Sequence, residues 1–388
     1  MKIAIWLYLF LFVAFFDLHA QYPILTPFAI SLGAAPSFIG LMMGIYSFTH
    51  LPGNLIAGFS VDRYGSRIFI IGSLFGAGLI LLFQAHISNP WQLLFLRSIS
   101  GFVLAFLSPA CLSLLARLAR DHIQQGKLMA GNGLVHTLAS VVSPAAGAFL
   151  VAQIGFSKSF TVLGWVLIAI AGVAIFAIHD RPQPVMETDI NASTADIENL
   201  EDPLPQMPWR FFVLPLAIAC SQGILFFELP LMKEALESIM KAGVFFSVIS
   251  LGALLTLSLL FLSRYSAHVR TWIGSLALAI SFFAIAIPTP FPLIALLFIV
   301  GMSKGIIFPA MSSYLIELSG GTRYGRMFST MSIASSIGYF IGPLLAGQLR
   351  ELVSPYFIAF FILMTALCIL PSNHKTRPQL LPTLPNKS

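Results

Sequence analysis

Long uninterrupted apolar runs fill this sequence, and they restrict the chain to a fold inside a membrane. Its 388 residues are 57% hydrophobic and only 9% charged, whereas soluble domains carry about 25% charged residues. Each run approaches the roughly 20 residues that a helix needs to cross a bilayer. The runs are continuous rather than alternating, which favours helices over a closed barrel. We therefore expect an all-α integral membrane protein.

The apolar runs form two sets of six, separated by a polar stretch. They lie at 4–31, 37–60, 68–87, 91–115, 128–152, 159–178, 210–231, 242–263, 271–288, 292–316, 327–349 and 354–371. The expected organisation is an N-terminal six-helix bundle (1–178), a linker (179–209), a C-terminal six-helix bundle (210–372) and a tail (373–388). The linker holds seven of the 15 Asp and Glu residues and five prolines, a composition typical of a flexible connector.

Positive charge is unequally divided between the loops. With the N-terminus in the cytoplasm, fifteen Lys and Arg residues fall on the inner side and four on the outer side. Cytoplasmic loops of membrane proteins are enriched in these residues, so we expect a multi-pass protein of the cytoplasmic membrane with both termini inside. The net charge of +6 is spread over short loops, which predicts no nucleic-acid partner. The three cysteines have no metal-ligand spacing, so neither a metal nor a cofactor is expected, and we expect a monomer in the bilayer.

The two halves of the sequence are related to each other. Three short matches share one offset of 199 or 200 residues: Ser108-Pro109-Ala110 with Phe308-Pro309-Ala310, Gly126-Lys127 with Gly325-Arg326, and Ser143-Pro144 with Gly342-Pro343. Many transporters consist of duplicated helical halves with the binding site between them. The repeat therefore predicts twelve transmembrane helices in two pseudo-symmetric six-helix bundles.

A short polar loop joins the second and third runs and reads Gly-Phe-Ser-Val-Asp-Arg-Tyr-Gly-Ser-Arg at 58–67. This string resembles the signature loop of the major facilitator superfamily of secondary transporters, roughly G-x-x-x-D-R-x-G-R-R, with Ser66 where the family usually has a basic residue. Arg97 and Gly101 in the fourth run resemble the family's R-x-x-x-G motif. The resemblance covers the whole chain. It implies two bundles that alternately expose a central site to the two sides of the membrane.

The residues of the 58–67 loop suggest a latch between moving parts. Gly58 lies one turn before Asp62 on the same helical face, and its missing side chain would let another helix approach closely. Asp62 would then face the positive N-terminal end of that helix. Arg63 and Arg67 would be free for carboxylates of the next cytoplasmic loop; the alternative is a simple positive-inside anchor. The expected latch set is Gly58, Asp62, Arg63, Gly65, Arg67 and Asp121.

Asp17 lies near the middle of the first run, and Gln21 follows four residues later on the same helical face. A carboxyl group at this depth can take up and release a proton. Its position before Pro23 is similar to that of acidic first-helix residues in proton-coupled drug exporters of the family that the chain resembles. The alternative is an Asp held in place by hydrogen bonds to neighbouring helices.

Other polar residues also interrupt the apolar runs. Arg97 and Lys304 lie within spans, where a charge needs a partner or a water-filled cavity; alternatively, Arg97 extends to the lipid headgroups. An isolated membrane His also commonly makes a hydrogen bond between helices, and a Glu near a helix end can be merely interfacial. The expected proton-coupling and cavity set is Asp17, Gln21, His50, Asn54, Arg97, His136, Glu228 and Lys304.

Small residues and proline mark the fifth and eleventh runs. The eleventh resembles the G-x-x-x-G-P-x-x-G motif of exporters in the family, whereas the fifth is a degenerate copy. Small residues beside a proline produce a closely packed helix that can bend, as expected where packing changes. The expected helix-interface set is Pro144, Gly147, Gly338, Gly342, Pro343 and Gly347.

Three functional hypotheses remain open from the sequence. The preferred one is proton-coupled export of a small organic solute by alternating access. The second is uptake of an anionic nutrient with Arg97 and Lys304 as contacts, and the third is a membrane receptor or scaffold that transports nothing. The sequence contains neither a phosphate-binding G-x-x-x-x-G-K-[ST] loop nor a recognisable nucleophile–base set, so we expect no enzyme and no ATP-driven step.

Overall fold

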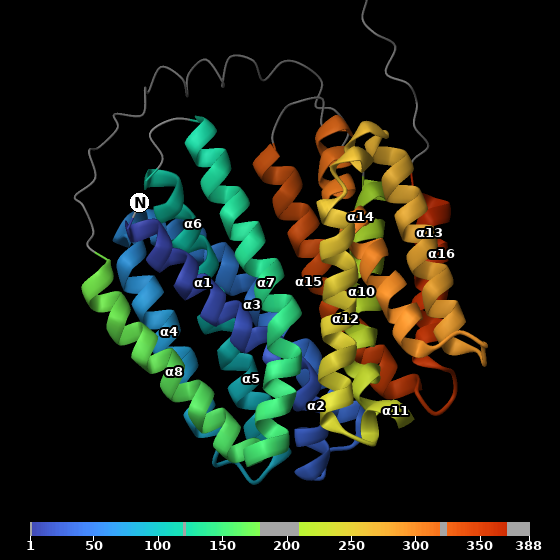
Figure 1. Cartoon of the computed structure of the whole chain (residues 1–388), viewed down its shortest axis with the longest axis horizontal. Coiled ribbons are helices and arrows are strands. Elements are labelled where there is room, and N and C mark those ends of the chain that lie inside the picture. Colours follow the sequence, from blue (N-terminus) through green and yellow to red (C-terminus); the bar gives the residue numbers. More distant parts are fainter. Residues whose placement is uncertain (1, 119–121, 179–208, 319–323, 371–388) are drawn as a thin grey trace, which may run out of the picture.

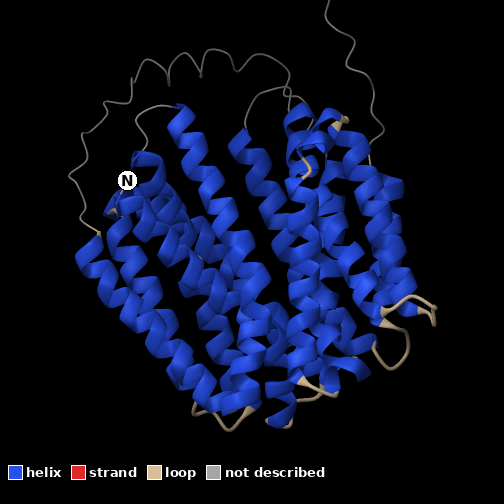
Figure 2. Ribbon diagram, in the orientation of Figure 1, coloured by secondary structure: helices blue, strands red, loops and turns tan. Residues whose placement is uncertain are grey.

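The computed structural model describes residues 2–118, 122–178, 209–318 and 324–370. Within these ranges the regular structure consists of helices, as Figure 2 shows, and contains no strand. This agrees with the all-α membrane protein that the apolar runs predict. The expected linker (179–209) and tail (373–388), apart from Trp209, lie outside the described residues.

The helices of the first half follow the predicted order (Figure 1). They are α1 (Lys2–Ala20), α2 (Tyr22–Ser31), α3 (Pro36–Tyr64), α4 (Ser66–Gln84), α5 (Pro90–Leu104), α6 (Leu107–Leu118), α7 (His122–Ile154) and α8 (Phe156–Ala177).

The helices of the second half repeat the arrangement. They are α10 (Trp209–Glu228), η2 (Leu229–Leu231), α11 (Lys233–Leu236), α12 (Ile239–Ser258), η3 (Leu260–Arg264), α13 (Ala267–Ala286), α14 (Leu293–Leu318), α15 (Tyr324–Leu349) and α16 (Pro355–Ile369).

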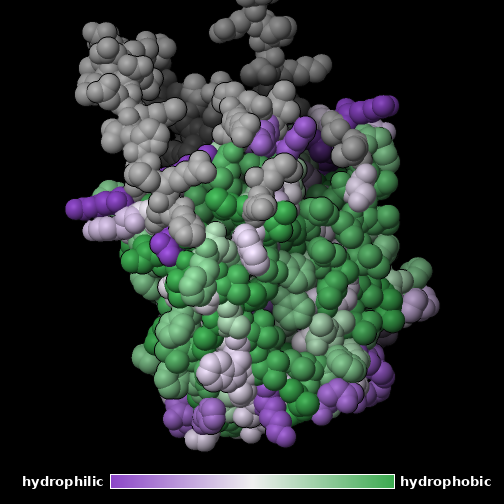
Figure 3. Space-filling model, turned by 60° about the vertical axis from the view of Figure 1, so that its left-hand side comes forward, coloured by the Kyte–Doolittle hydropathy of each residue, from purple (hydrophilic) through white to green (hydrophobic). Residues whose placement is uncertain are grey.

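Ten stretches of the described chain are long and apolar enough to cross a bilayer. The two other expected spans coincide with α3, which has 29 residues, and with α16, an apolar helix of 15 residues. In Figure 3 an apolar band covers the middle of the visible face, with hydrophilic side chains above and below it. Large apolar side chains such as Phe176 (80% exposed) lie on the surface, as expected where lipid replaces water.

Two of the expected spans are each divided between two α-helices rather than continuous, which corrects the sequence prediction. The first breaks at Gln21, between α1 and α2, and the fourth breaks between α5 and α6. Each break lies within four residues before a proline, Pro23 or Pro109. Proline has no N–H to donate, and its ring clashes with the carbonyl one turn earlier. The first break therefore falls directly beside the polar residues of the first span.

The helices run between two faces of the molecule (Figure 1). We call the face where α8 ends at Ala177 and α10 begins at Trp209 the linker face, and the face where α2 ends at Ser31 and α3 begins at Pro36 the α2 face. The two halves pack together along two seams, α3 against α15 and α7 against α12.

Each seam contains a glycine packed against the carbonyl of a helix proline. A side chain at Gly40 in α3 would collide with the carbonyl oxygen of Pro343 in α15. In the other seam, a Cβ at Gly243 in α12 would lie 2.6 Å from the carbonyl oxygen of Pro144 in α7. Because Pro144 and Pro343 are equivalent in the sequence repeat, the two seams are copies of one contact. Both lie toward the α2 face.

The remaining members of the expected helix-interface set also contact neighbouring helices. Gly147 packs on the carbonyl of Ala20 in α1, and Gly347 packs on that of Pro36 at the start of α3. Gly338 and Gly342 pack on the backbone of α10. Missing side chains let these backbones approach closely.

Replacing Gly40 with Ala should weaken the α3–α15 seam. We expect the free energy of unfolding to fall by about 1–3 kcal/mol, the usual cost of overpacking a close contact. Gly72→Ala in α4 is the matched control, because no atom lies within 4 Å of the added methyl group and the gain in helix propensity is the same. Unfolding of both variants in detergent, followed by circular dichroism, measures the difference. Equal stabilities would show that the seam is not closely packed.

Candidate functional site

A cavity of about 320 Å³ lies between the two halves, next to the break in the first span. Its walls come from α1, α2, α3 and α5 on one side and from α10 and α15 on the other. The lining residues are Leu18, Tyr22, Met43, Tyr46, Ser47, His50, Asn54, Arg97, Gly223, Phe226, Ser332, Ser335, Ser336, Tyr339 and Pro343. Since Pro343 also belongs to the α3–α15 seam, this packing borders the cavity toward the α2 face.

A chain of hydrogen bonds joins the two ionisable groups beside this cavity. The side-chain amide of Gln21 donates from Nε2 to Asp17 Oδ1 at 2.9 Å. Its oxygen Oε1 accepts from a terminal guanidinium nitrogen of Arg97 at 3.0 Å. All three residues are at least 96% buried (exposed fractions 3%, 2% and 4%). Within the described part of the chain, Gln21 thus bridges a carboxylate and a guanidinium that do not pair directly.

The local structure explains how these groups meet. Asp17 and Gln21 lie one turn apart on the same helical face, with Gln21 at the break. Arg97 projects from α5, and its guanidinium lies 4.5 Å above the ring of Tyr46 in α3. The backbone of Tyr46 packs directly on Gly101, one turn after Arg97. The glycine of the R-x-x-x-G motif therefore lets α3 approach closely enough to place Tyr46 over the arginine.

A polar stripe on α3 continues the cavity wall toward the linker face. Asn54 donates from Nδ2 to His50 Nδ1 at 3.0 Å, so the proton of a neutral His50 ring resides on Nε2. The ring of His50 stacks on Tyr46 with centroids 5.7 Å apart. All three residues line the cavity. His50 and Asn54, two members of the expected cavity set, are thus hydrogen-bonded to each other beside the cavity.

A second polar cluster contains His19, His136 and Lys304. His19 donates from Nδ1 to the carbonyl of Phe15 at 2.7 Å, and its ring lies 5.2 Å from that of His136 in α7. Lys304 in α14 interacts electrostatically with both histidines. None of the three lines the 320 Å³ cavity. Apart from Glu228, the expected cavity set is therefore divided between two neighbouring clusters.

An aromatic pair lies between the two clusters. Tyr22 of α2 stacks on Phe226 of α10 with centroids 4.3 Å apart, and both rings line the cavity. On the other side, Tyr22 contacts His19 at 5.3 Å, and the Lys304 ammonium lies 5.7 Å from the Phe226 centroid. The pair thus joins the two halves of the chain and the two polar clusters.

Glu228 does not belong to the cavity, in contrast to the sequence prediction. Its carboxylate pairs with Arg350 at 3.0 and 3.2 Å. Glu228 ends α10, and Arg350 directly follows α15, so both lie at the α2 face. The pair fastens the ends of two helices of the second half.

The 58–67 loop forms the turn between α3 and α4. Gly65 has φ 87°, which favours glycine. Arg67 donates to the carbonyl of Ile175 in the last turn of α8 at 2.7 Å, where a cation is favourable. The Arg63 guanidinium lies 5.3 Å from the ring of Tyr64. The side chain of Asp62 and the whole of Asp121 lie outside the described structure.

Gly58 has open space around it in this conformation, since none of the described atoms lies within 4 Å of a Cβ at this position. The helix approach that the sequence predicts at Gly58 is therefore not made here. The two seams hold the halves together toward the α2 face, whereas Gly58 lies in the last turns of α3, toward the linker face.

Several lining residues were not predicted from the sequence. Ser332, Ser335, Ser336 and Tyr339 lie at helical spacing on α15, and this polar stripe in an apolar helix was a detectable signal. Tyr22, Tyr46 and Phe226 carried no such signal. In a chain with 35 Phe and nine Tyr residues, an aromatic residue that faces a cavity is indistinguishable by type from one that faces lipid.

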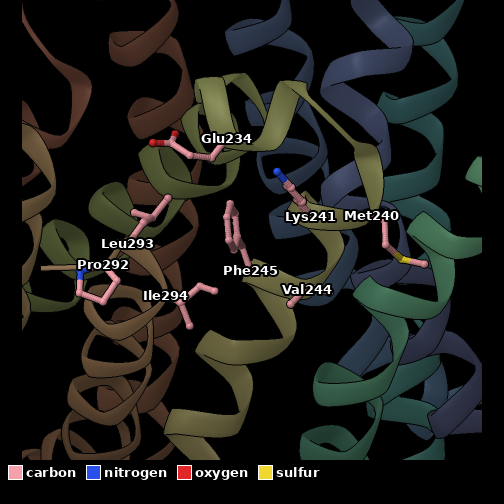
Figure 4. Close-up of a pocket in the computed structure, with 8 residues that line it drawn as sticks. All are labelled: Glu234, Met240, Lys241, Val244, Phe245, Pro292, Leu293 and Ile294. Carbon is pink, nitrogen blue, oxygen red and sulfur yellow. The ribbon is translucent and has the colours of Figure 1, made fainter.

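A second pocket of about 390 Å³ lies within the second half, between the α2-face ends of α12 and α14. Figure 4 shows apolar side chains around Phe245, with Glu234 and Lys241 at its edge. Lys241 pairs with Glu237 one turn earlier. This pocket receives no lining residue from the first half and none from the expected cavity set, so the central cavity is the better candidate site.

Two helical halves that enclose a polar cavity between them are the arrangement of secondary transporters. The sequence matches the Major Facilitator Superfamily over residues 7–292 and, in an overlapping match, 273–382. The chain belongs to this superfamily and is accordingly a membrane transporter rather than an enzyme.

Known relatives and solved structures extend over most of the chain. "Multidrug resistance protein MdtG" of Escherichia coli (strain 55989 / EAEC) is 25% identical over 362 residues, which cover 89% of this chain and 87% of MdtG. The "multi-drug resistance efflux pump PmrA homolog" of Lactococcus lactis subsp. lactis (strain IL1403) is 23% identical over 346 residues, covering 86% and 84%.

A bacterial homolog of the human lysosomal transporter Spinster, solved in an inward-facing and occupied conformation, superposes with a TM-score of 0.75 at 15% identity and covers 94% of this chain and 95% of its own. Its unoccupied inward-facing structure gives a TM-score of 0.73 at 14% identity, covering 95% and 94%. At this identity the likeness shows the fold alone.

The bridge through Gln21 should appear as energetic coupling between Asp17 and Arg97. In a double-mutant cycle of Asp17→Asn and Arg97→Gln, we expect a coupling energy of about 0.5–3 kcal/mol in stability. The coupling should disappear in a Gln21→Leu background. Asp17→Asn combined with Arg350→Gln is the control pair, because Arg350 bonds to Glu228 at the α2 face. Additive effects of Asp17→Asn and Arg97→Gln would rule out the bridge.

Proposed function

We propose that this protein is a secondary active transporter that exports a small organic solute across the cytoplasmic membrane in exchange for protons. The observation that carries the proposal is the buried Asp17, bridged to Arg97 beside a cavity that both halves line. The relatives named as multidrug resistance and efflux proteins support the direction and the substrate class.

Asp17 is the proposed proton carrier. Its ionised carboxylate accepts a hydrogen bond from Gln21, and this amide in turn accepts from Arg97. Hydrogen bonds to ionised groups are roughly twice as strong as neutral ones, so proton uptake by Asp17 weakens the link between α1 and α5. The weakened link no longer holds Arg97, beside Tyr46 of α3, in the position in which it contacts a solute. Uptake of a proton and release of a solute are thereby linked at one amide.

Alternating access is the proposed motion, with residues 1–178 and 210–372 as the two moving bodies. The two seams lie toward the α2 face, where glycine packs on proline carbonyls. Orientation follows from the excess of Lys and Arg, which assigns both termini and the linker face to the cytoplasm. In this conformation the seams close the cavity on the external side. Closure on the cytoplasmic side would bring another helix against Gly58 and engage the 58–67 latch.

Asp17→Asn should abolish proton-driven transport without unfolding the protein. Everted membrane vesicles acidify their interior during respiration, so an exporter should accumulate a fluorescent naphthalene solute inside them. We expect accumulation with the wild type, loss with Asp17→Asn, and retention with Glu228→Gln, whose carboxylate lies outside the cavity. Unchanged accumulation in Asp17→Asn would remove Asp17 from coupling. An uptake carrier would instead expel the solute from these vesicles.

Gly58→Leu should abolish transport without affecting folding. The conformation described here has space for the new side chain, so the variant should fold with the stability of wild type. Closure of the linker face would be blocked, and accumulation in everted vesicles should be lost. Gly72→Leu, which has similar space in α4, serves as the control that retains transport. Full activity of Gly58→Leu would refute the latch.

A further inference from the structure

The charges around the central cavity do not balance. Among the described side chains at this depth, Arg97 and Lys304 carry positive charge, while Asp17 carries negative charge and is 97% buried behind Gln21 (exposed fraction 3%). The other intramembrane carboxylate considered above, Glu228, is paired with Arg350 at the α2 face. A net positive charge therefore remains next to the cavity.

Arg97, one of the two positive residues, also has an unused hydrogen-bond donor. Its Nε is buried and has no partner in the described structure, although Arg97 lines the cavity. Burying a donor without a partner is unfavourable, and more so on a charged group. An anionic oxygen in the cavity would satisfy it. A cation would meet no exposed carboxylate there.

Lys304 adds a second positive charge behind the aromatic wall. Its ammonium lies over Phe226 at 5.7 Å, and the ring of Phe226 lines the cavity on the other side of the pair. Electrostatic interaction in the low dielectric of a membrane protein extends further than in water. Lys304 therefore favours a negative charge in the cavity without touching it.

The cavity also presents surfaces suited to a planar ring. Phe226 of α10 and Tyr339 of α15 lie parallel within 1°, with centroids 6.3 Å apart, and both line the cavity. Stacking on aromatic rings contributes to binding beyond the burial of area.

We infer that the cavity selects planar aromatic solutes that carry a negative charge, with Arg97 as the anion contact, Lys304 as an electrostatic support, and Phe226 and Tyr339 as the ring platform. This inference rests on the proposed transport function and specifies its substrate class. It excludes organic cations as preferred cargo, because a cation would add to an uncompensated positive charge in a desolvated site.

Three probes that share the naphthalene ring system test the charge preference. They are 1-naphthoate (anionic), 1-naphthamide (neutral) and 1-naphthylmethylammonium (cationic). Binding to purified wild-type protein in detergent at pH 7 is measured by calorimetry. We expect 1-naphthoate to bind at least about tenfold more tightly than the ammonium probe, with the amide between them; tenfold corresponds to about 1.4 kcal/mol. Equal or tighter binding of the ammonium probe, or absence of 1-naphthoate binding, would overturn the inference.

Substitutions of two lysines test whether Lys304 favours the anionic probe specifically, or whether removing any positive charge has the same effect. Lys304→Gln should weaken 1-naphthoate binding several-fold while leaving the affinity for 1-naphthamide as in wild type. Lys241→Gln is the matched control, because Lys241 pairs with Glu237 at the α2 face and should change neither affinity. Equal weakening of both probes by Lys304→Gln would show a structural role and remove Lys304 from selection.

The binding measurements need no proton gradient, so they fail independently of the transport proposal. A preference for the anion without proton-driven accumulation would refute proton-coupled export and leave the charge selection intact. Proton-driven accumulation that depends on Asp17, together with a preference for the cationic probe, would support proton-coupled export and refute the charge selection.

Discussion

The hydrogen-bonded link from Asp17 through Gln21 to Arg97 allows charged groups to exist within the membrane part of this protein. One such charge at the centre of a bilayer costs about 2.5–3.5 kcal/mol on insertion scales. The amide of Gln21 satisfies both groups at once, since its nitrogen donates to the carboxylate and its oxygen accepts from the guanidinium. The two charged groups do not contact each other directly. A change in the charge of one therefore affects the other through the amide of Gln21.

The packing between the halves complements this link. Both seams bring a glycine of one half against a proline carbonyl of the other, and the sequence repeat relates the two contacts. A seam built from backbone surfaces has few interlocked side chains to disengage when the halves move apart. The prolines also bend readily within helices. Duplication thus supplied two similar seams between the two halves.

The aromatic pair Tyr22–Phe226 divides the central region. On one side lies the cavity with Arg97, Tyr46 and the polar stripe of α3; on the other lie His19, His136 and Lys304. Tyr22 follows the break at Gln21 directly. A proline that interrupts the first span therefore positions both the bridging amide and the aromatic wall, which connects local backbone chemistry to the shape of the site.

The sequence alone determined the helical membrane fold, the order of the spans and the placement of Asp17 and Gln21 on one helical face, because spans follow from apolar length and same-face residues from helical period. The sequence reasoning did not predict that the first and fourth spans are interrupted, although Pro23 and Pro109 cause the interruptions. Only the tertiary structure decided that Gln21 reaches Arg97, that Glu228 pairs with Arg350, and that Phe226 rather than another of the 35 phenylalanines faces the cavity. These contacts depend on how helices distant in sequence rotate and approach one another. Because lipid and the protein interior are both apolar, the sequence of an apolar helix does not show which of its faces contacts lipid and which contacts protein.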